Sequence, residues 1–251
     1  MFKKVTRAYE RIPAITAPLF MALFTGASLT THMRRKASSK EHVAAKALPE
    51  VGLTKDVVAA LPRTSYYANG RSMESMNVIL IGTKTELRNL YKLSGWYEAL
   101  PVSFVNLLRC ILAIKLRMQF LHGPVTPLYV GFTQQGLAFQ KPTSLNRFEQ
   151  RHHMRLWKTR FVAPSGQPIW IGQASYDKGI KQAGSLIKVP IHEIDGDLDA
   201  ERDLLRHDLI AGGGIDYGYI RLEAAHTGEN GFGDAFTSDG RAMVVGVQKS
   251  A

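Results

Sequence analysis

One strand–turn–strand pattern limits most strongly how this chain can fold. Residues 150–161 and 168–176 both show the two-residue periodicity of a β-strand, and the sequence Ala-Pro-Ser-Gly at positions 163–166 lies between them. Two such runs around a turn that contains proline and glycine predict an antiparallel hairpin. Counted outward from the turn, Trp157 and Trp170 are expected to lie near one another across the two strands, within one or two residues of register.

Other strand patterns surround this hairpin. Residues 77–82 form a short apolar, β-branched run that is typical of a buried strand. Residues 128–133 and 137–141 flank a Gln-Gln-Gly turn and predict a second hairpin. Because strands outnumber helices and hairpins dominate, we expect an α+β fold in which helices pack on a mainly antiparallel sheet. Further strands are expected at residues 186–193, 217–224 and 242–247.

Two helices have clear end signals. Thr83 and Glu86 match a capping box, and Gly95 stands where a helix C-terminus favours glycine. The acid-rich segment 199–203 suits the first turn of another helix, which the glycines at 212–214 end.

A third helix is expected over residues 103–121. Large apolar residues gather on one side of it, so we expect that side to face the core, with Lys115 extending its stem to solvent. The alternative is a helix that lies on a membrane surface. Cys110 is the only cysteine of the chain, so neither an intramolecular disulfide nor a multi-cysteine zinc site can form. The apolar residues of this side are Phe104, Leu107, Leu108, Ile111 and Leu112.

The N-terminal region has the sequence of a targeting segment. Residues 12–33 contain no Lys, Arg, Asp or Glu, and basic residues precede them. We therefore expect residues 1–36 to be a signal peptide or a membrane anchor, with 12–33 in contact with the membrane; a hydrophobic helix packed on the domain is the alternative. Residues 37–74 are expected to form a tether that packs only in part, and residues 75–251 the α+β domain.

The positive charge of the chain is concentrated at its N-terminus. The formal net charge is +11, but residues 1–40 hold eight basic residues and one acidic residue, which leaves 24 of the 32 basic and 20 of the 21 acidic residues for the rest. A nucleic-acid binder should carry a basic stripe on its folded domain. We therefore expect no nucleic-acid partner.

Polar chemistry is concentrated in residues 150–157. If this segment is a strand, Arg151, His153 and Arg155 share one face, whereas His152 points to the other. Burying an unpaired charge destabilises a fold by an amount on the order of several kcal/mol, so we expect these charged side chains to have partners. The alternative is an exposed strand face paired with acids on a neighbouring strand.

Three further segments supply partners for these side chains. Histidine with several carboxylates is a ligand set for a divalent metal, and histidine with Arg and Lys suits phosphate recognition. Both would serve a metal-assisted phosphoester hydrolase. We predict that His153, Arg155, Asp177 and His192 meet on one face, with Lys141 at the rim and Glu201 and Arg202 reaching in from the helix. The predicted catalytic residues are His153, Asp177 and His192; the predicted binding residues are Lys141, Arg151, His152, Arg155, Glu201 and Arg202; the predicted metal ligand is Asp195.

A family resemblance rests on motifs that occur in a fixed order. Residues 77–211 of this chain resemble the C-terminal domain of the LssY-like bacterial proteins. That family is named for a component assigned to type I secretion. The motifs are Val-Ile-Leu-Ile-Gly-Thr at 78–83, Gly-Trp at 95–96, Pro-Leu-Tyr at 127–129, Leu-Ala-Phe-Gln-Lys-Pro at 137–142, Gln-Arg-His-His-Met-Arg-Leu-Trp at 150–157, Trp-Ile-Gly-Gln-Ala-Ser-Tyr-Asp at 170–177 and the His-Glu-Ile-Asp segment that begins at 192.

The resemblance implies a bacterial cell-envelope protein, membrane-anchored or periplasmic, because relatives carry this domain after membrane-embedded segments that include a lipid-phosphatase-like one. The signature of those phosphatases does not occur in order in this chain, so their catalytic residues are not carried over. Two functions are expected. One is a hydrolase of a phosphorylated or otherwise anionic envelope substrate, with a divalent metal as a candidate cofactor; the other is a non-catalytic envelope module that binds a lipid headgroup or a protein.

Overall fold

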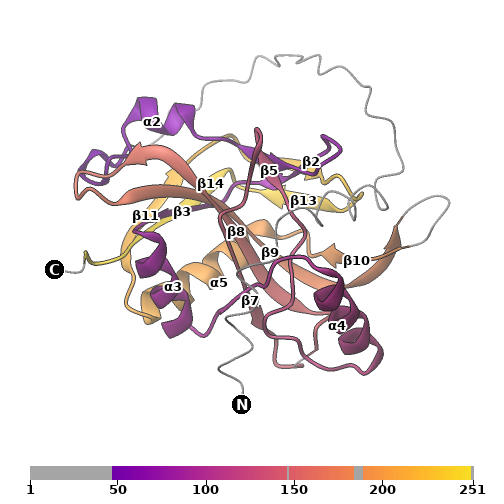
Figure 1. Ribbon diagram of the computed structural model, residues 1–251. Helices are drawn as coiled ribbons and strands as arrows, with labels where there is room; N and C mark the ends of the chain where they lie inside the picture. The colour runs from indigo at the N-terminus through magenta and orange to yellow at the C-terminus, as the bar shows by residue number, and fades with distance from the viewer. Residues whose placement is uncertain (1–46, 146, 184–188, 250–251) are drawn as a thin grey trace.

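The fold is described from a computed structural model, which places residues 47–249 except Asn146 and residues 184–188. An eight-stranded sheet forms its centre, with strands in the order β11-β14-β3-β9-β8-β7-β4 and with β10 paired to β9 (Figure 1). Its neighbouring strands are antiparallel except for β14 and β3. The strands are β3 (Val78–Ile81), β4 (Tyr97–Glu98), β7 (Leu137–Pro142), β8 (Arg151–Val162), β9 (Pro168–Ala183), β10 (Val189–Ile194), β11 (Ile215–Arg221) and β14 (Arg241–Gly246).

Two smaller sheets accompany the central one. The first is four-stranded, in the order β2-β1-β5-β6, and the second is the β12–β13 hairpin. With the helices, these elements confirm an α+β fold with a mainly antiparallel sheet. Their bounds are β1 (Thr64–Tyr66), β2 (Ser72–Ser75), β5 (Tyr129–Val130), β6 (Thr133–Gln134), β12 (His226–Glu229) and β13 (Ala235–Ser238).

The longest strands are the predicted hairpin, β8 and β9, which turn at Gly166. The second predicted hairpin is wrong. Strand β5 turns back after Val130, where Gly131 has a φ of 59°, and it pairs with β6. Residues 137–142 pair instead with β8 and β4. Gly131 adopts the left-handed conformation that a tight turn requires, so the chain reverses there, before it reaches the Gln-Gln-Gly sequence.

Helices α3 and α5 cover one face of the central sheet. Thr83 accepts a hydrogen bond from the Glu86 backbone and Glu86 bonds back to the Thr83 backbone, which confirms the capping box of α3. Asp197 caps α5 by accepting from the Ala200 N–H. The helices are η3 (Pro49–Val51), α2 (Lys55–Ala60), α3 (Lys84–Leu93), α4 (Phe104–Lys115) and α5 (Leu198–Ala211).

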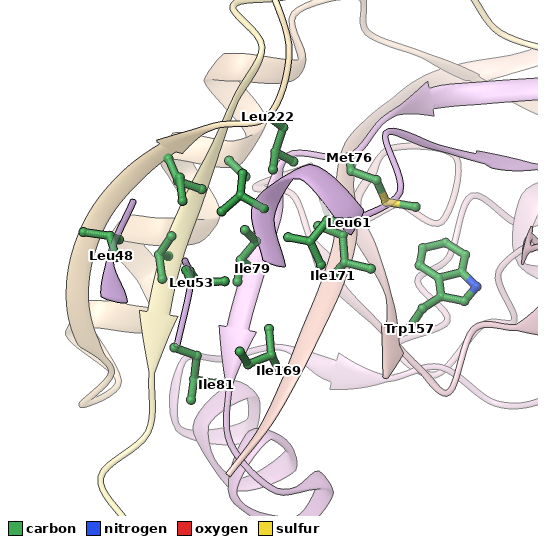
Figure 2. Close-up of a cluster of buried hydrophobic side chains, with 14 of the residues drawn as sticks. Leu48, Leu53, Leu61, Met76, Ile79, Ile81, Trp157, Ile169, Ile171 and Leu222 are labelled. Carbon is green, nitrogen blue, oxygen red and sulfur yellow. The ribbon is translucent and has the colours of Figure 1, made fainter. Parts of the chain in front are cut away.

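The opposite face of the sheet is covered by residues 48–76. Leu53 and Val58 are fully buried there against strand residues such as Ile79 and Ile169. Figure 2 shows this cluster, in which Leu48, Leu53 and Leu61 surround the strand side chains. Of the predicted 37–74 tether, the described part packs against the sheet through residues such as Leu53 and Val58, while the turn at residues 68–72 is exposed. The predicted leader, residues 1–36, lies outside the described residues. No helix among the described residues is long and apolar enough to span a membrane.

Trp157 and Trp170 lie at neighbouring positions of the β8–β9 ladder, as expected, but their side chains do not meet. Trp157 pairs with Ile171 and Trp170 with Lys158, so the two tryptophans are one residue out of register. A one-residue offset places side chains on opposite faces of a sheet. Trp157 packs with the residues of Figure 2, whereas Trp170 packs under α3 and donates to the Gly82 carbonyl, so the predicted pairing of the two rings is wrong.

Helix α4 confirms the predicted helix over Phe104–Lys115 but ends before the predicted residue 121, and its orientation differs from the expected one. Leu108 is 49% exposed and Leu112 is 56% exposed, so the apolar side that was expected to face the core faces outward. The residues that turn inward are Asn106 and Ala113. The prediction of a core-facing apolar side is therefore wrong.

A glycine pair in β9 tests the packing between β8 and β9. A Cβ at Gly172 would lie 2.5 Å from the Arg155 carbonyl oxygen, whereas a Cβ at Gly179 would meet open space. We expect Gly172→Ala to lower the free energy of unfolding by about 1–3 kcal/mol, the usual effect of overpacking. Gly179→Ala is the matched control and should leave it nearly unchanged. Urea unfolding followed by tryptophan fluorescence measures both; equal stability of the two variants would contradict this packing.

Candidate functional site

Four side chains from three neighbouring strands meet at Asp177 and form what is called here the Asp177 cluster. Arg151 Nε lies 2.9 Å from Asp177 Oδ2, and His153 Nδ1 lies 3.3 Å from Oδ1. His192 Nδ1 lies 3.2 Å from Oδ2. The structure thus brings all three predicted catalytic residues together with Arg151.

The strand register explains this convergence. Arg151 stands opposite Asp177 in the β8–β9 ladder, and His153 follows two residues later on the same face. On β10, Ile194 pairs with Asp177, and an irregularity separates it from Glu193. Because alternate residues share a face, His192 lies on the Asp177 side two residues before Ile194.

The cluster is buried except at one histidine. Asp177 is 2% exposed, while the His192 side chain is 20% exposed. The guanidinium of Arg151 also donates to Gln140 Oε1 at 2.6 Å, and it lies 4.4 Å from the ring centre of Phe148. Phe148 in turn packs edge-on against His192, with ring centres 5.3 Å apart. His192 is therefore the only member of the cluster with appreciable exposure.

The charges of the cluster follow from this burial. Burial lowers the pKa of His192 to about 4, although Asp177 opposes the shift, and burial likewise lowers the pKa of His153. Burial alone would raise the pKa of Asp177, but His153, His192 and Arg151 outweigh it and hold that pKa well below its ordinary value. Near pH 7 the cluster therefore contains a carboxylate, a guanidinium and two neutral imidazoles.

Some polar atoms of the cluster face partners without a well-aligned hydrogen bond. Within the described part of the chain, His153 Nδ1 and His192 Nδ1 form none, and neither does the Oγ of Ser175, which lies opposite His153 on β9. Buried polar atoms in this state are rare and often mark functional positions. Ser175 was not predicted from the sequence, because one serine in a strand gives no pattern.

Arg155 shares the face of the cluster but does not contact Asp177. Its Nε donates to the Thr126 carbonyl at 3.1 Å, and Gln173 stands opposite it in the ladder. Gln173 bonds the Ser65 hydroxyl and the Glu74 backbone, which extends a buried polar row away from Asp177. Glu74 was also missed, since its strand lies in the region that was expected to pack only in part.

Three predicted members lie on the opposite face of the sheet or at its edge. His152 Nδ1 lies 2.8 Å from Glu201 Oε2, and Lys141 Nζ lies 2.7 Å from Asp208 Oδ2. Both pairs join the sheet to α5. The prediction that Lys141 and Glu201 border the same face as Asp177 is therefore wrong, and their predicted binding roles stay predictions.

Arg202 and Asp195 also lie outside the cluster. Arg202 is fully buried and pairs with Asp199, Asp203 and Asp239, so it fixes α5 to the turn before β14. Asp195 accepts a hydrogen bond from the Asp197 N–H in the turn before α5. Among the described residues, no group of three or more His, Cys, Asp or Glu side chains is arranged to hold a metal ion. At Asp177, Arg151 supplies a positive charge.

The lowered pKa of His192 predicts how stability depends on pH. Between about pH 6.5 and about pH 4 the unfolded chain binds a proton at this histidine that the folded chain does not. The free energy of unfolding should therefore fall as the pH is lowered through this window, by about 1.4 kcal/mol per pH unit at most for this one group.

Chemical unfolding at a series of pH values measures this dependence. His192→Gln should make it less steep, because one of the two buried histidines with a lowered pKa is gone and His153 keeps its own contribution. His207→Gln is the matched control, since that ring is exposed on α5, and it should keep the wild-type dependence. A His192→Gln profile as steep as that of the wild type would contradict the assignment.

The comparisons with known proteins agree with the motif order. The model of the LssY C-terminus family matches residues 58–242. None of the curated proteins and none of the solved structures compared with the chain matches it. The matched range contains β7 through β13 and the entire Asp177 cluster. The chain therefore belongs to the LssY C-terminus family.

Proposed function

We propose that this domain hydrolyses a phosphorylated or otherwise anionic ester in the bacterial cell envelope, with His192 as the general base. One observation carries the proposal: a buried carboxylate, Asp177, faces two histidines, and one of them reaches the surface. Titratable groups with strongly shifted pKa values are concentrated at active sites more than elsewhere. The uncharged segment 12–33 supports the envelope setting.

The geometry suits proton transfer at His192. Its Nδ1 faces Asp177, and the ring also has a backbone hydrogen bond with Glu149. For catalysis the ring would exchange that bond for one to a water molecule, from which Nε2 would take a proton. The water oxygen forms a bond to the phosphorus or carbonyl carbon, the ester bond breaks, and the leaving oxygen receives the proton from His192. Asp177 orients the ring and stabilises the imidazolium that forms. Arg151 and His153 act as positioning residues, because they hold Asp177 in place.

The charge around the cluster supports an anionic substrate. Residues 99–148 contain no Asp or Glu, and they supply Arg109, Lys115, Arg117 and Arg147 besides Lys141, which is paired with Asp208. The stretch includes Phe148, which packs against His192, and it is followed by Glu149. Arg147 is partly exposed beside Phe148. An excess of basic side chains raises the local concentration of anionic ligands.

The second candidate, a non-catalytic module that grips an anion with Arg151 and Arg155, is less well supported. Both guanidinium groups are buried, and both already donate to protein oxygens at 3.3 Å or less. A ligand would have to displace these bonds and enter the sheet to reach them.

Hydrolysis assays on the full-length chain test the proposal. The probes are p-nitrophenyl phosphate and bis(p-nitrophenyl) phosphate, with p-nitrophenyl acetate as the neutral ester. We expect turnover of the anionic esters and a loss of about a hundredfold or more in kcat for His192→Gln, the usual effect of removing a general base. Asp177→Asn should lower kcat with little change in KM and should alter the pH profile.

The exposed-histidine variant His207→Gln is the control and should keep full activity. Circular dichroism must first show that each variant is folded, because Asp177 is buried. Full activity in His192→Gln, or wild-type protein that turns over none of the three esters, would refute the proposal.

A further inference from the structure

Helix α4 carries a row of exposed apolar side chains, called here the α4 face. Its residues recur at the three- and four-residue spacings of one helix side, so they form a continuous stripe. Exposed apolar stripes of this kind are uncommon on monomeric proteins and mark surfaces that bind a partner. The residues of the α4 face are Val105, Leu108, Ile111, Leu112 and Leu116.

The helix packs on the domain with its other side. Asn106 and Ala113 are the buried residues of α4, and the Asn106 amide donates to the Pro101 carbonyl. Ser103 caps the helix by accepting a hydrogen bond from the Asn106 N–H. The large apolar side chains of α4 therefore face outward, which favours a partner with an apolar surface.

The charges beside the α4 face indicate which partner this is. Arg109, Lys115 and Arg117 are exposed, and they lie in a stretch of the sequence, residues 99–148, that contains no Asp or Glu. By its position in the helix, Lys115 lies within the apolar stripe, where its stem can extend along an interface while its amine reaches phosphate. Apolar side chains with cations and without anions match the boundary region of an anionic bilayer.

The end of the helix adds an independent observation. Arg117 has a φ of 51°, and it is the only non-glycine residue with positive φ in the described part of the chain. The Met118 N–H bonds the Ala113 carbonyl there, in the arrangement that normally takes glycine. A side chain in this conformation is disfavoured, so the chain places a cation where glycine would be more stable.

We propose that the α4 face binds the surface of an anionic lipid bilayer, with α4 lying in the plane of the interface. This proposal does not depend on hydrolysis by the Asp177 cluster. The two are neighbours nonetheless, because the segment after α4 packs on the cluster: Phe148 N–H bonds the Met118 carbonyl, and Arg151 donates to the Pro124 carbonyl. Figure 1 shows α4 at the margin of the molecule.

A site-specific fluorescent label tests the proposal in the full-length chain. Because Cys110 is the only cysteine, Cys110→Ser allows one new cysteine to carry an environment-sensitive dye. The test variant is Cys110→Ser with Leu108→Cys. The control is Cys110→Ser with Phe132→Cys, since Phe132 is fully exposed on the turn between β5 and β6, outside the α4 face.

With vesicles of equal parts phosphatidylglycerol and phosphatidylcholine, the dye at position 108 should shift its emission to the blue. Nitroxide-labelled lipid should quench it. Pure phosphatidylcholine should produce neither effect, and the dye at 132 should respond to neither vesicle. Arg109→Gln, Lys115→Gln and Arg117→Gln should each raise the vesicle concentration at half-effect by roughly fivefold, the contribution expected of one basic residue near an anionic surface.

Three results would overturn the proposal. Vesicle binding without any shift at 108 would mean that another segment, such as residues 12–33, makes the contact. A blue shift at 108 that grows with protein concentration in the absence of vesicles would identify a second copy as the occupant. An equal response at 108 and 132 would show unspecific adsorption.

Discussion

A carboxylate that is 2% exposed inside a sheet needs a counter-charge, and Asp177 obtains it from Arg151, 2.9 Å away across the β8–β9 ladder. Removing one partner of such a pair would leave an uncompensated buried charge, which destabilises a protein by about 3–5 kcal/mol. β8 and β9 are also the longest strands and occupy the middle of the central sheet. The pair therefore fixes the register on which the placement of His153 and His192 depends.

The alternation of β8 divides its polar residues between two tasks. The side chains of Arg151, His153 and Arg155 join the buried polar row on one face, and His152 joins the sheet to α5 through Glu201 on the other. The single site expected from the sequence is therefore two sets of contacts separated by the sheet. The first set contains Asp177 and His192, whose pKa values are strongly lowered, and it reaches solvent at His192. The second set ties α5 to the sheet.

Much of the fold could be predicted from local patterns. The β8–β9 hairpin, the capping box of α3 and the meeting of His153, Asp177 and His192 followed from periodicity and from the high energy of unpaired buried charge. Register could not be predicted to one residue, and for that reason Trp157 and Trp170 were placed on the same side. The orientation of α4 was missed because an amphipathic pattern does not say whether the apolar side meets the core or an external partner. Glu74 and Ser175 were missed because contacts between distant segments leave no local signal.

Burial keeps His192 unprotonated beside the ionised Asp177, so that the ring can act as a base. A titration of the histidine ring signals by nuclear magnetic resonance measures its protonation, with His192→Gln used to assign the signal. We expect the His192 ring to take up its proton only near its lowered pKa of about 4. A His192 signal that titrates at the ordinary histidine pKa of about 6.5 would contradict it.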